Sequence, residues 1–470
     1  MPHGCKKITI LGAGMAGLVA AHELEELGHQ VEVIEGSERL GGRVRTHRFG
    51  DGESAPLVEL GAMRIPAKHR HTMDYVEKLG LSPKLKEFKT LFSEEDAYYT
   101  TSAGFVRVRD VAKVLVDEFR VLIADHNLRE ETILFGAWLT AVGDAIGPAA
   151  IRAMLRTDFL ADLLEAVDRI DLEPFLAGQA RDQIDLHAFF AAHPEVRTSG
   201  AGKLNTFIED ILDETSSRLL RLEGGMDQLV GTLASRIEGP IRTGHEVRAI
   251  EIRDDHVAVT VYNTEQARTL LCDYVLCTIP FSVLGKLRLI GFSDDKLAII
   301  DEVRYGSATK VAFHCREPFW ERDGINGGAS FGGGRIRQTY YPPVEGDPAN
   351  GAALLASYTV ADDADVLGKM PEAQRHDVVL GEAGAMHPDL HEPGMVVEAV
   401  SHAWGEYRWN DGAAVMRWGK DPAACEEERD RAARPEGRLF FAGEHCSSNA
   451  AWIDGAIESA FCAVRAIEEH

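Results

Sequence analysis

Three glycines and one acid near the start of the chain have the spacing of a dinucleotide-binding site. Gly12, Gly14 and Gly17 form a Gly-x-Gly-x-x-Gly pattern, and Glu35 follows at about the 20-residue distance typical of a ribose-binding acid. The first glycine permits a tight turn, the second lets the backbone approach a pyrophosphate, and the third allows close packing of a helix on a strand. The acid suits a ribose 2′-hydroxyl rather than a 2′-phosphate. The alternative is a glycine-rich turn that binds nothing.

The sequence around these residues supplies the elements that such a site needs. A β-branched apolar run over 7–11 predicts a buried strand, and apolar residues at helical spacing predict a helix that ends near Gly28. An alternating run over 31–35 predicts a second strand, which ends in the acid. The N-terminus of the helix offers free N–H groups and a positive dipole end to phosphates. Together these elements favour a βαβ nucleotide-binding unit over an isolated turn.

The composition narrows the class of protein. With 470 residues and 45% hydrophobic content, the chain is long enough for about three domains. Its net charge of −25 disfavours binding to nucleic acid or to an anionic membrane, because both need basic surfaces. The seven cysteines include no CxxC pair and no zinc spacing, so we expect reduced thiols, no metal site and a cytoplasmic location. No apolar run is long enough to span a membrane.

A second glycine pair, with arginines on both sides, follows the acid. The run that begins at Gly36 contains Arg39-Leu-Gly41-Gly42-Arg43. Together with the first glycine pattern, it resembles the extended FAD-binding signature of flavin-containing amine oxidases. The resemblance extends over essentially the whole chain and implies FAD rather than NAD as the cofactor.

This resemblance also implies how the chain is organised. We expect an α/β fold in which a Rossmann-type FAD-binding domain joins a mixed-sheet substrate-binding domain and a helical insertion. Periodic apolar residues and few glycines over 106–217 favour the helical insertion. The expected boundaries are 1–66, 218–282 and 426–470 for FAD binding, 67–105 and 283–425 for substrate binding, and 106–217 for the helices.

The run Gly61-Ala-Met-Arg64-Ile-Pro66 resembles the L-amino-acid oxidase branch of the family. The resemblance implies that Arg64 binds the α-carboxylate of the substrate. A guanidinium suits this task, because it offers two parallel donors at carboxylate spacing and stays charged. The alternative is an arginine paired with an acid of the protein itself.

Two further catalytic residues are expected in the second half of the chain. In a strand-like run over 308–313, the resemblance implies that Lys310 binds a water beside the flavin N5; the alternative is a lysine at a sheet edge. The Tyr340-Tyr341-Pro342 run resembles the segment whose tyrosine joins the arginine at the carboxylate. Side chains alternate along a strand, so only one of the two tyrosines can face the site. We predict Tyr341 and keep Tyr340 as the alternative.

The end of the chain resembles the C-terminal FAD signature of the family. The Ala-Gly-Glu444 run implies an acid near the ribityl–pyrophosphate, and Ala451 and Trp452 are expected at the substrate. The stretch 404–418, where covalently flavinylated members carry a cysteine, contains none, so the resemblance implies non-covalent FAD. The predicted cofactor-binding residues are Gly12, Gly14, Ala16, Gly17, Glu35, Gly36, Arg39, Gly42, Arg43, Gly61, Ala62, Met63, Arg64, Val247, Gly443, Glu444, Trp452, Ile453 and Ala456.

The function that the resemblance implies is oxidation of an L-amino acid by O2. The segments 131–139 and 331–342 look closest to the L-tryptophan oxidases of indolocarbazole biosynthesis. Those enzymes convert tryptophan, or a chlorinated tryptophan, to the imine of indole-3-pyruvate. The residue chemistry alone does not select an indole. We also expect a homodimer.

Four alternatives are kept for the function. One is an L-amino-acid oxidase or dehydrogenase of broad or different specificity. The second is an amine oxidase whose substrates lack a carboxylate, and the Arg64 motif argues against it. The third is a flavin desaturase or dehydrogenase that uses oxygen poorly. The fourth is a nucleotide-binding regulatory or structural protein without turnover.

Overall fold

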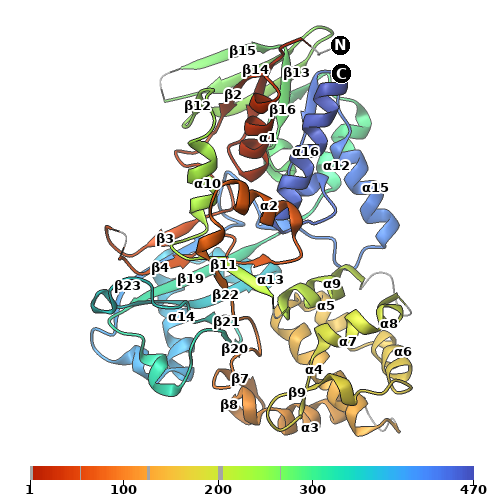
Figure 1. Cartoon of the computed structure of the whole chain (residues 1–470), viewed down its shortest axis with the longest axis vertical. Coiled ribbons are helices and arrows are strands. Elements are labelled where there is room, and N and C mark those ends of the chain that lie inside the picture. The colour runs from red at the N-terminus through yellow and green to blue at the C-terminus, as the bar shows by residue number, and fades with distance from the viewer. Residues whose placement is uncertain (1–3, 53, 124–126, 199–204, 217, 265) are drawn as a thin grey trace.

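A computed structural model describes residues 4–52, 54–123, 127–198, 205–216, 218–264 and 266–470 of the chain. Figure 1 shows a sheet with β1 (Lys7–Leu11) and β16 (Tyr274–Cys277) in the upper half of the molecule, close to both termini. A second sheet with β19 (Ala308–Cys315) and β22 (Ala352–Val360) lies at the lower left, and a group of helices lies at the lower right. The predicted α/β class is confirmed.

Five parallel strands form the upper sheet. The other three strands of this sheet are β2 (Gln30–Ile34), β12 (Ile241–Arg242) and β25 (Leu439–Phe441). The helices α1 (Met15–Glu26), α10 (Asp227–Ala234) and α16 (Ile453–Glu469) pack against it. The strand order is β12-β2-β1-β16-β25, so the first strand lies at the centre. Its side chains Ile8 and Ile10 are buried in one core with residues of α1, α10 and α16. The succession β1, α1, β2 confirms the predicted βαβ unit.

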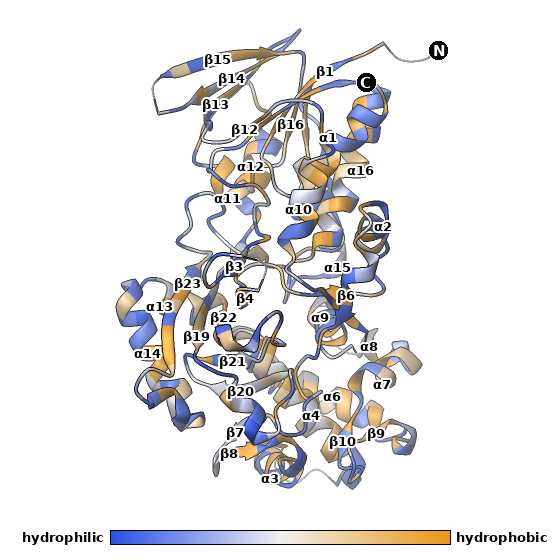
Figure 2. Cartoon of the chain, turned by 60° about the vertical axis from the view of Figure 1, so that its left-hand side comes forward, coloured by the Kyte–Doolittle hydropathy of each residue, from blue (hydrophilic) through white to orange (hydrophobic). Residues whose placement is uncertain are grey.

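The second sheet has seven strands in the order β23-β19-β22-β21-β20-β7-β8. The new strands are β7 (Tyr98–Thr101), β8 (Gly104–Arg107), β20 (Ala329–Gly333), β21 (Arg337–Tyr340) and β23 (Val396–Ala403). Only β20 and β7 pair in parallel, so the sheet is mixed. α14 (Glu372–Met386) packs on one face of this sheet. Figure 2 shows both hydrophilic and hydrophobic residues on α14, as expected for a helix with one buried face.

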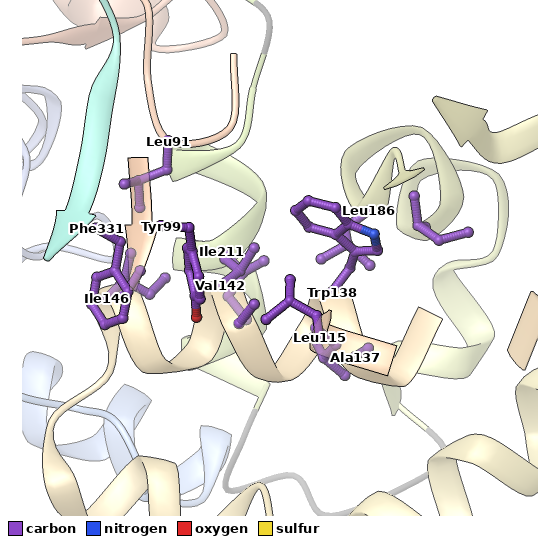
Figure 3. Close-up of a cluster of buried hydrophobic side chains, with 14 of the residues drawn as sticks. Leu91, Tyr99, Leu115, Ala137, Trp138, Val142, Ile146, Leu186, Ile211 and Phe331 are labelled. Carbon is purple, nitrogen blue, oxygen red and sulfur yellow. The ribbon is translucent and has the colours of Figure 1, made fainter. Parts of the chain in front are cut away.

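Helices occupy most of the described residues from 112 to 214. They are α3 (Ala112–Ile123), α4 (Glu130–Ile146), α5 (Ala149–Met154), α6 (Asp158–Val167), α7 (Leu186–Ala192), α8 (Pro194–Thr198) and α9 (Asn205–Glu214), with a short hairpin of β9 (Leu176–Ala177) and β10 (Gln183–Ile184). α4 is buried on nearly every side. Figure 3 shows its side chains Trp138, Val142 and Ile146 among apolar residues of the other helices and of the sheet, including Phe331. Helices and sheet therefore share one core.

Smaller sheets connect or extend these layers. A four-stranded sheet has the order β15-β14-β13-β17, and its strands β13 to β15 lie at the top of Figure 1. Three smaller sheets have the orders β5-β11-β6, β3-β4 and β18-β24. The bounds are β3 (Thr46–Arg48), β4 (Leu57–Glu59), β5 (Ile65–Pro66), β6 (Leu85–Glu87), β11 (Leu219–Leu222), β13 (Glu246–Ile252), β14 (Val257–Tyr262), β15 (Ala267–Cys272), β17 (Arg288–Ile290), β18 (Tyr305–Gly306) and β24 (Ala414–Val415). The remaining helices are α2 (Arg70–Lys78), α11 (Phe281–Leu284), α12 (Asp294–Glu302), α13 (Ala361–Gly368) and α15 (Pro422–Ala433). Among the residues described, none of these helices has both the length and the apolar character to cross a membrane.

Candidate active site

The first cavity lies at the carboxyl ends of the parallel strands. β1, β2, β16 and β25 are each followed by a loop that lines it. Ligands of open α/β sheets bind at this edge of the sheet, in the crevice outside the strand ends. The predicted cofactor residues that line this cavity are Gly12, Gly14, Ala16, Glu35, Gly36, Arg39, Gly42, Arg43, Ala62, Val247, Gly443, Glu444, Trp452, Ile453 and Ala456.

The glycine turn after β1 is too crowded for a larger residue at two positions. A Cβ on Gly17 would lie 2.0 Å from the carbonyl oxygen of Gly12, and a Cβ on Gly12 would lie 2.5 Å from Oγ1 of Thr278. Gly17 does not line the cavity, and its role is to let α1 approach the turn. Gly14 precedes α1 and supplies no side-chain cap, so no side chain competes with a ligand for the first N–H groups of the helix.

Two charged residues after β2 are held by backbone groups. The carboxylate of Glu35 accepts hydrogen bonds from the N–H groups of Ala13 and Ser37, both at 2.8 Å. A carboxylate has further lone pairs, which suit the hydroxyls of a ribose. The guanidinium of Arg39 donates to backbone carbonyls of its own loop at 3.1 and 3.0 Å. Arg39 therefore holds the shape of the loop that carries the second glycine pair.

Glu444 joins three distant segments at the cavity wall. Its side chain is buried, with the residue 3% exposed. It accepts a hydrogen bond from Nη1 of Arg43 at 2.5 Å and others from the backbone N–H groups of Val415 at 3.0 Å and Ala451 at 2.9 Å. Ala451 has a φ of +69°, a left-handed conformation that residues with a Cβ rarely adopt. One buried carboxylate thus fixes the loop after β2 against the C-terminal part of the chain.

A second cavity adjoins the first. The wall that the two cavities share consists of Ala62, Ala413, Ala451, Trp452 and Ile453. The predicted cofactor residues that line the second cavity and not the first are Gly61, Met63 and Arg64. The two residues predicted at the substrate in the C-terminal signature, Ala451 and Trp452, therefore lie between the two spaces. A ligand in the second cavity would meet a cofactor in the first across this wall.

Lys310 projects from the interior strand β19 into the second cavity. The residue is 3% exposed, and its Nζ donates to the carbonyl oxygens of Glu59 at 3.1 Å and Gly61 at 2.7 Å. The Nζ also lies 4.6 Å from the ring centre of Tyr358. Burial, reinforced by the charge of Arg64, lowers the pKa of Lys310 to about 7, although the carboxylate of Glu59 opposes the shift. The lysine is therefore not at a sheet edge, and a role beside the flavin stays a prediction.

Arg64 lies in the same cavity, between two aromatic rings. Its guanidinium carbon is 5.8 Å from the ring centre of Phe88 and 5.9 Å from that of Trp452. Nη1 donates to the hydroxyl of Tyr340 at 3.3 Å, and Nη2 forms an ion pair with Glu214. The arginine thus has a protein acid as its partner, which was the alternative expectation, and it also faces the cavity.

The prediction that Tyr341 faces Arg64 is wrong, and Tyr340 takes that place. Tyr340 contacts Arg64 and packs in the core that the helical group shares with the sheet, whereas Tyr341 packs in a different core. The Tyr341 hydroxyl lies 2.5 Å from Oγ of Ser330 and 2.7 Å from Nε2 of His387, in the core beneath α14. Successive side chains of a strand point to opposite faces of the sheet, so only one tyrosine of the pair can face Arg64. The sequence of the pair alone does not reveal which one does so.

Several cavity residues carry no motif that sequence reasoning could use. Glu214 and Asp210 come from α9, and Trp418 comes from the segment after β24. The indole N–H of Trp418 donates to the Asp210 carboxylate, so the helical group and the C-terminal half of the chain meet at the cavity. Gln338 lies two residues before Tyr340, and strand alternation is the one signal that links them.

Comparison with known proteins shows which family this chain belongs to. Residues 15–468 match the family described as flavin containing amine oxidoreductase. The chain belongs to this family. It is a flavin-dependent oxidoreductase, and its cofactor is FAD.

Individual members of the family differ in how closely they resemble the chain. The chain is 79% identical to the flavin-dependent L-tryptophan oxidase RebO of Lentzea aerocolonigenes, over 100% of this chain and 99% of that protein. An L-amino-acid oxidase of Daboia russelii is 29% identical over 98% of this chain and 88% of its own. A solved structure of putrescine oxidase bound to putrescine has a TM-score of 0.66 at 19% identity and covers 99% of this chain and 100% of its own. That likeness concerns the fold alone.

The residues of the first cavity fit FAD. The crowded glycine turn and the uncapped start of α1 suit a pyrophosphate, and the Glu35 carboxylate suits the hydroxyls of the adenosine ribose. No cysteine is among the described residues that line this cavity.

Proposed function

We propose that this chain is an FAD-dependent L-amino-acid oxidase whose substrate is L-tryptophan or a halotryptophan. The reaction consumes the amino acid, O2 and water and yields the 2-oxo acid, ammonia and H2O2, by way of the imino acid. The observation that carries the proposal is the position of Arg64 beside Tyr340, in a cavity that shares a wall with the cofactor cavity. The 79% identity to a protein named as an L-tryptophan oxidase supports the choice of substrate.

The cofactor supplies the redox chemistry, and the chain supplies position and field. When bound, FAD would supply a two-electron acceptor for the hydride of the substrate Cα and a route for these electrons to O2. Glu35, the start of α1 and Glu444 would hold its adenosine, pyrophosphate and ribityl parts. The lining of the first cavity, in which the described residues include no cysteine, supports non-covalent binding.

Arg64 and Tyr340 orient the substrate. A guanidinium and a phenol hydroxyl together offer several donors to a carboxylate. Arg64 lines the second cavity, and the hydroxyl of Tyr340 lies beside its Nη1. Holding the carboxylate there fixes the Cα–H relative to the shared wall, so that the reaction becomes effectively unimolecular. Glu214 occupies Arg64 in the absence of substrate, so binding exchanges one carboxylate for another.

The amine of the substrate must be neutral before the hydride can leave. Two cationic side chains, Arg64 and Lys310, line the cavity in which the amine would lie. A cation close to the bound amine disfavours its ammonium form and so lowers its pKa, whereas the carboxylates that also line the cavity, such as Glu214, act in the opposite direction. Deprotonation to solvent on binding then takes the place of a dedicated base.

The test is a panel of candidate substrates followed by peroxide and flavin absorbance. We expect H2O2 from L-tryptophan and none from D-tryptophan or tryptamine. Equal turnover of tryptamine would indicate an amine oxidase, and flavin bleaching without peroxide would indicate a dehydrogenase. No response to any L-amino acid would overturn the proposal in favour of a nucleotide-binding protein without turnover.

The role of Arg64 has its own test. Arg64→Lys keeps a positive charge beside Glu214 but loses the two parallel N–H donors of the guanidinium. The KM for L-tryptophan should therefore rise about 10- to 100-fold. Arg64→Ala combined with Glu214→Gln avoids a buried unpaired acid and should raise KM further, while flavin content stays at the wild-type level. A KM near the wild-type value in both variants would remove Arg64 from the carboxylate site.

A further inference from the structure

Gln338 lines the second cavity and carries a buried hydrogen-bond acceptor without a partner in the described part of the chain. The residue is 4% exposed and lies on β21, in the wall of this cavity. Its Nε2 donates to the carbonyl oxygen of Ala145 at 2.7 Å. Its Oε1 is buried and has no hydrogen-bond partner among the residues that the structure describes. A buried acceptor of this kind costs free energy until a donor reaches it.

The orientation of the amide follows from its neighbour. A carbonyl oxygen can only accept, so the NH2 group of Gln338 must face Ala145 and the oxygen must face the other way. The apolar and aromatic residues that line the same cavity include Ile146, Tyr358 and Trp418. The amide therefore adds one acceptor and no spare donor to this cavity. The carboxylates of Asp210, Asp213 and Glu214 also line it and pair with Trp418, Lys68 and Arg64, respectively.

The position of Gln338 along the strand relates it to the carboxylate site. Gln338 and Tyr340 lie two residues apart on β21, where they pair with Phe331 and Ala329 of β20, so about 7 Å separates them along the strand. Tyr340 contacts Arg64, so a substrate whose carboxylate binds there can extend along β21 with its far end near Gln338. Register also places Gln338 opposite Tyr358 on β22.

We propose that Oε1 of Gln338 accepts a hydrogen bond from the ring N–H of an indole substrate and so selects tryptophan over side chains of similar size without a donor. This inference rests on the proposed function. An indole offers one N–H donor and no competing acceptor, which matches the one unpaired oxygen of the amide. A site that holds an unpaired acceptor rejects a ligand that lacks the donor, because the acceptor then stays buried without a partner. Gln338 is a specificity-determining residue in this account.

The experiment compares two substrates that differ at one ring atom. In 3-benzothienyl-L-alanine a sulfur replaces the indole N–H and leaves the shape nearly unchanged. For the wild-type holoenzyme we expect kcat/KM for L-tryptophan to exceed that for the sulfur analogue by about 10-fold or more. Equal values in the wild type would overturn the inference without any variant.

The variant Gln338→Met removes the acceptor and keeps the length of the side chain. We expect the ratio of the two kcat/KM values to fall towards one, while L-phenylalanine is oxidised at a rate within a few-fold of the wild type. Thr339→Val is the matched control, since Thr339 is buried on the other face of β21 and donates to the carbonyl oxygen of Ala356 at 2.9 Å. It should leave the ratio unchanged. A ratio that stays high in Gln338→Met would also overturn the inference.

The outcomes separate this inference from the proposed function. Turnover of L-tryptophan and of its sulfur analogue at equal rates would contradict only the role of Gln338. Absence of turnover with every L-amino acid would contradict both.

Discussion

The guanidinium of Arg64 and the carboxylate of Glu214 form an ion pair inside the second cavity, where their side chains are 8% and 12% exposed. Glu214 is the last residue of α9, and Arg64 precedes β5, so the pair joins the helical group to the loop that follows β4. Removing one partner of a buried pair is costly, because the other charge is left uncompensated. A substrate carboxylate provides such compensation for Arg64 and releases Glu214.

Glu214→Gln should therefore strengthen substrate binding. The amide keeps the volume of the side chain but competes less well for the guanidinium, so we expect the KM for L-tryptophan to fall by about 3- to 10-fold. The measurement is steady-state peroxide formation. Glu165→Gln removes a charge from an exposed position on α6 that does not line the second cavity, and its KM should stay within about two-fold of the wild type. A KM that does not fall in Glu214→Gln would show that the acid does not compete with the substrate.

Tyr340→Phe and Tyr341→Phe should change different properties of the protein, the first KM and the second stability. Tyr340 contacts Arg64, so loss of its hydroxyl should raise the KM for amino acids by about 10-fold and change stability little. Tyr341 is buried between Ser330 and His387, so loss of its hydroxyl should lower the free energy of unfolding by about 1–3 kcal/mol and leave KM unchanged. Thermal unfolding and steady-state kinetics on both variants make the comparison. The reverse pattern would place Tyr341 at the carboxylate.

Lys310 should make the binding of carboxylates depend on pH. Burial and the charge of Arg64 lower the pKa of Lys310 to about 7, so it is cationic below that pH and neutral above it. The cation attracts a carboxylate, and the inhibition constant of indole-3-propionate should therefore rise as pH increases through about 7. This inhibitor has no amine, so no substrate ammonium titrates in the same range.

The control for this prediction is Lys310→Met, which removes the titrating group. The inhibition constant of this variant should be higher at pH 6 than that of the wild type. It should rise less steeply from pH 6 to 8, because Asp210, whose pKa burial raises to about 7, still titrates in the same cavity. Equal slopes in the wild type and the variant would mean that Lys310 does not change its charge in this range.

Glu444→Gln should weaken the binding of FAD. An amide cannot replace the carboxylate at Arg43 and at the two backbone N–H groups of Val415 and Ala451 without losing acceptors. We expect the Kd for FAD, measured by fluorescence titration of the apoprotein, to rise at least about 10-fold. Glu458→Gln is the control, since this acid lies on α16 but pairs only with exposed Ser448 among the contacts described. Equal FAD affinity in both variants would contradict a role of Glu444 in shaping the site.

The sequence by itself determined the nucleotide-binding unit. Gly12, Gly14, Gly17 and Glu35 lie within one short βαβ segment, and local propensity and spacing are enough to place them around one turn. Glu444, near the C-terminus, also lines this cavity. Its position could be predicted because the Ala-Gly-Glu444 run resembles the C-terminal FAD signature of the family. Signals of this kind depend on residues that are close in sequence or on a motif that is shared as a whole.

Only the tertiary structure decided the content of the second cavity. The choice between Tyr340 and Tyr341 depended on the phase of β21, which a bulge at Arg337 in its pairing with both neighbouring strands helps to set. The partnership of Arg64 with Glu214 joins residues from separate layers, and no local pattern encodes that contact. The acceptor of Gln338 became visible only when its amide was seen to be fixed by Ala145. Such contacts arise from long-range packing, whose free energy is decided by which surfaces meet and not by the residues next in sequence.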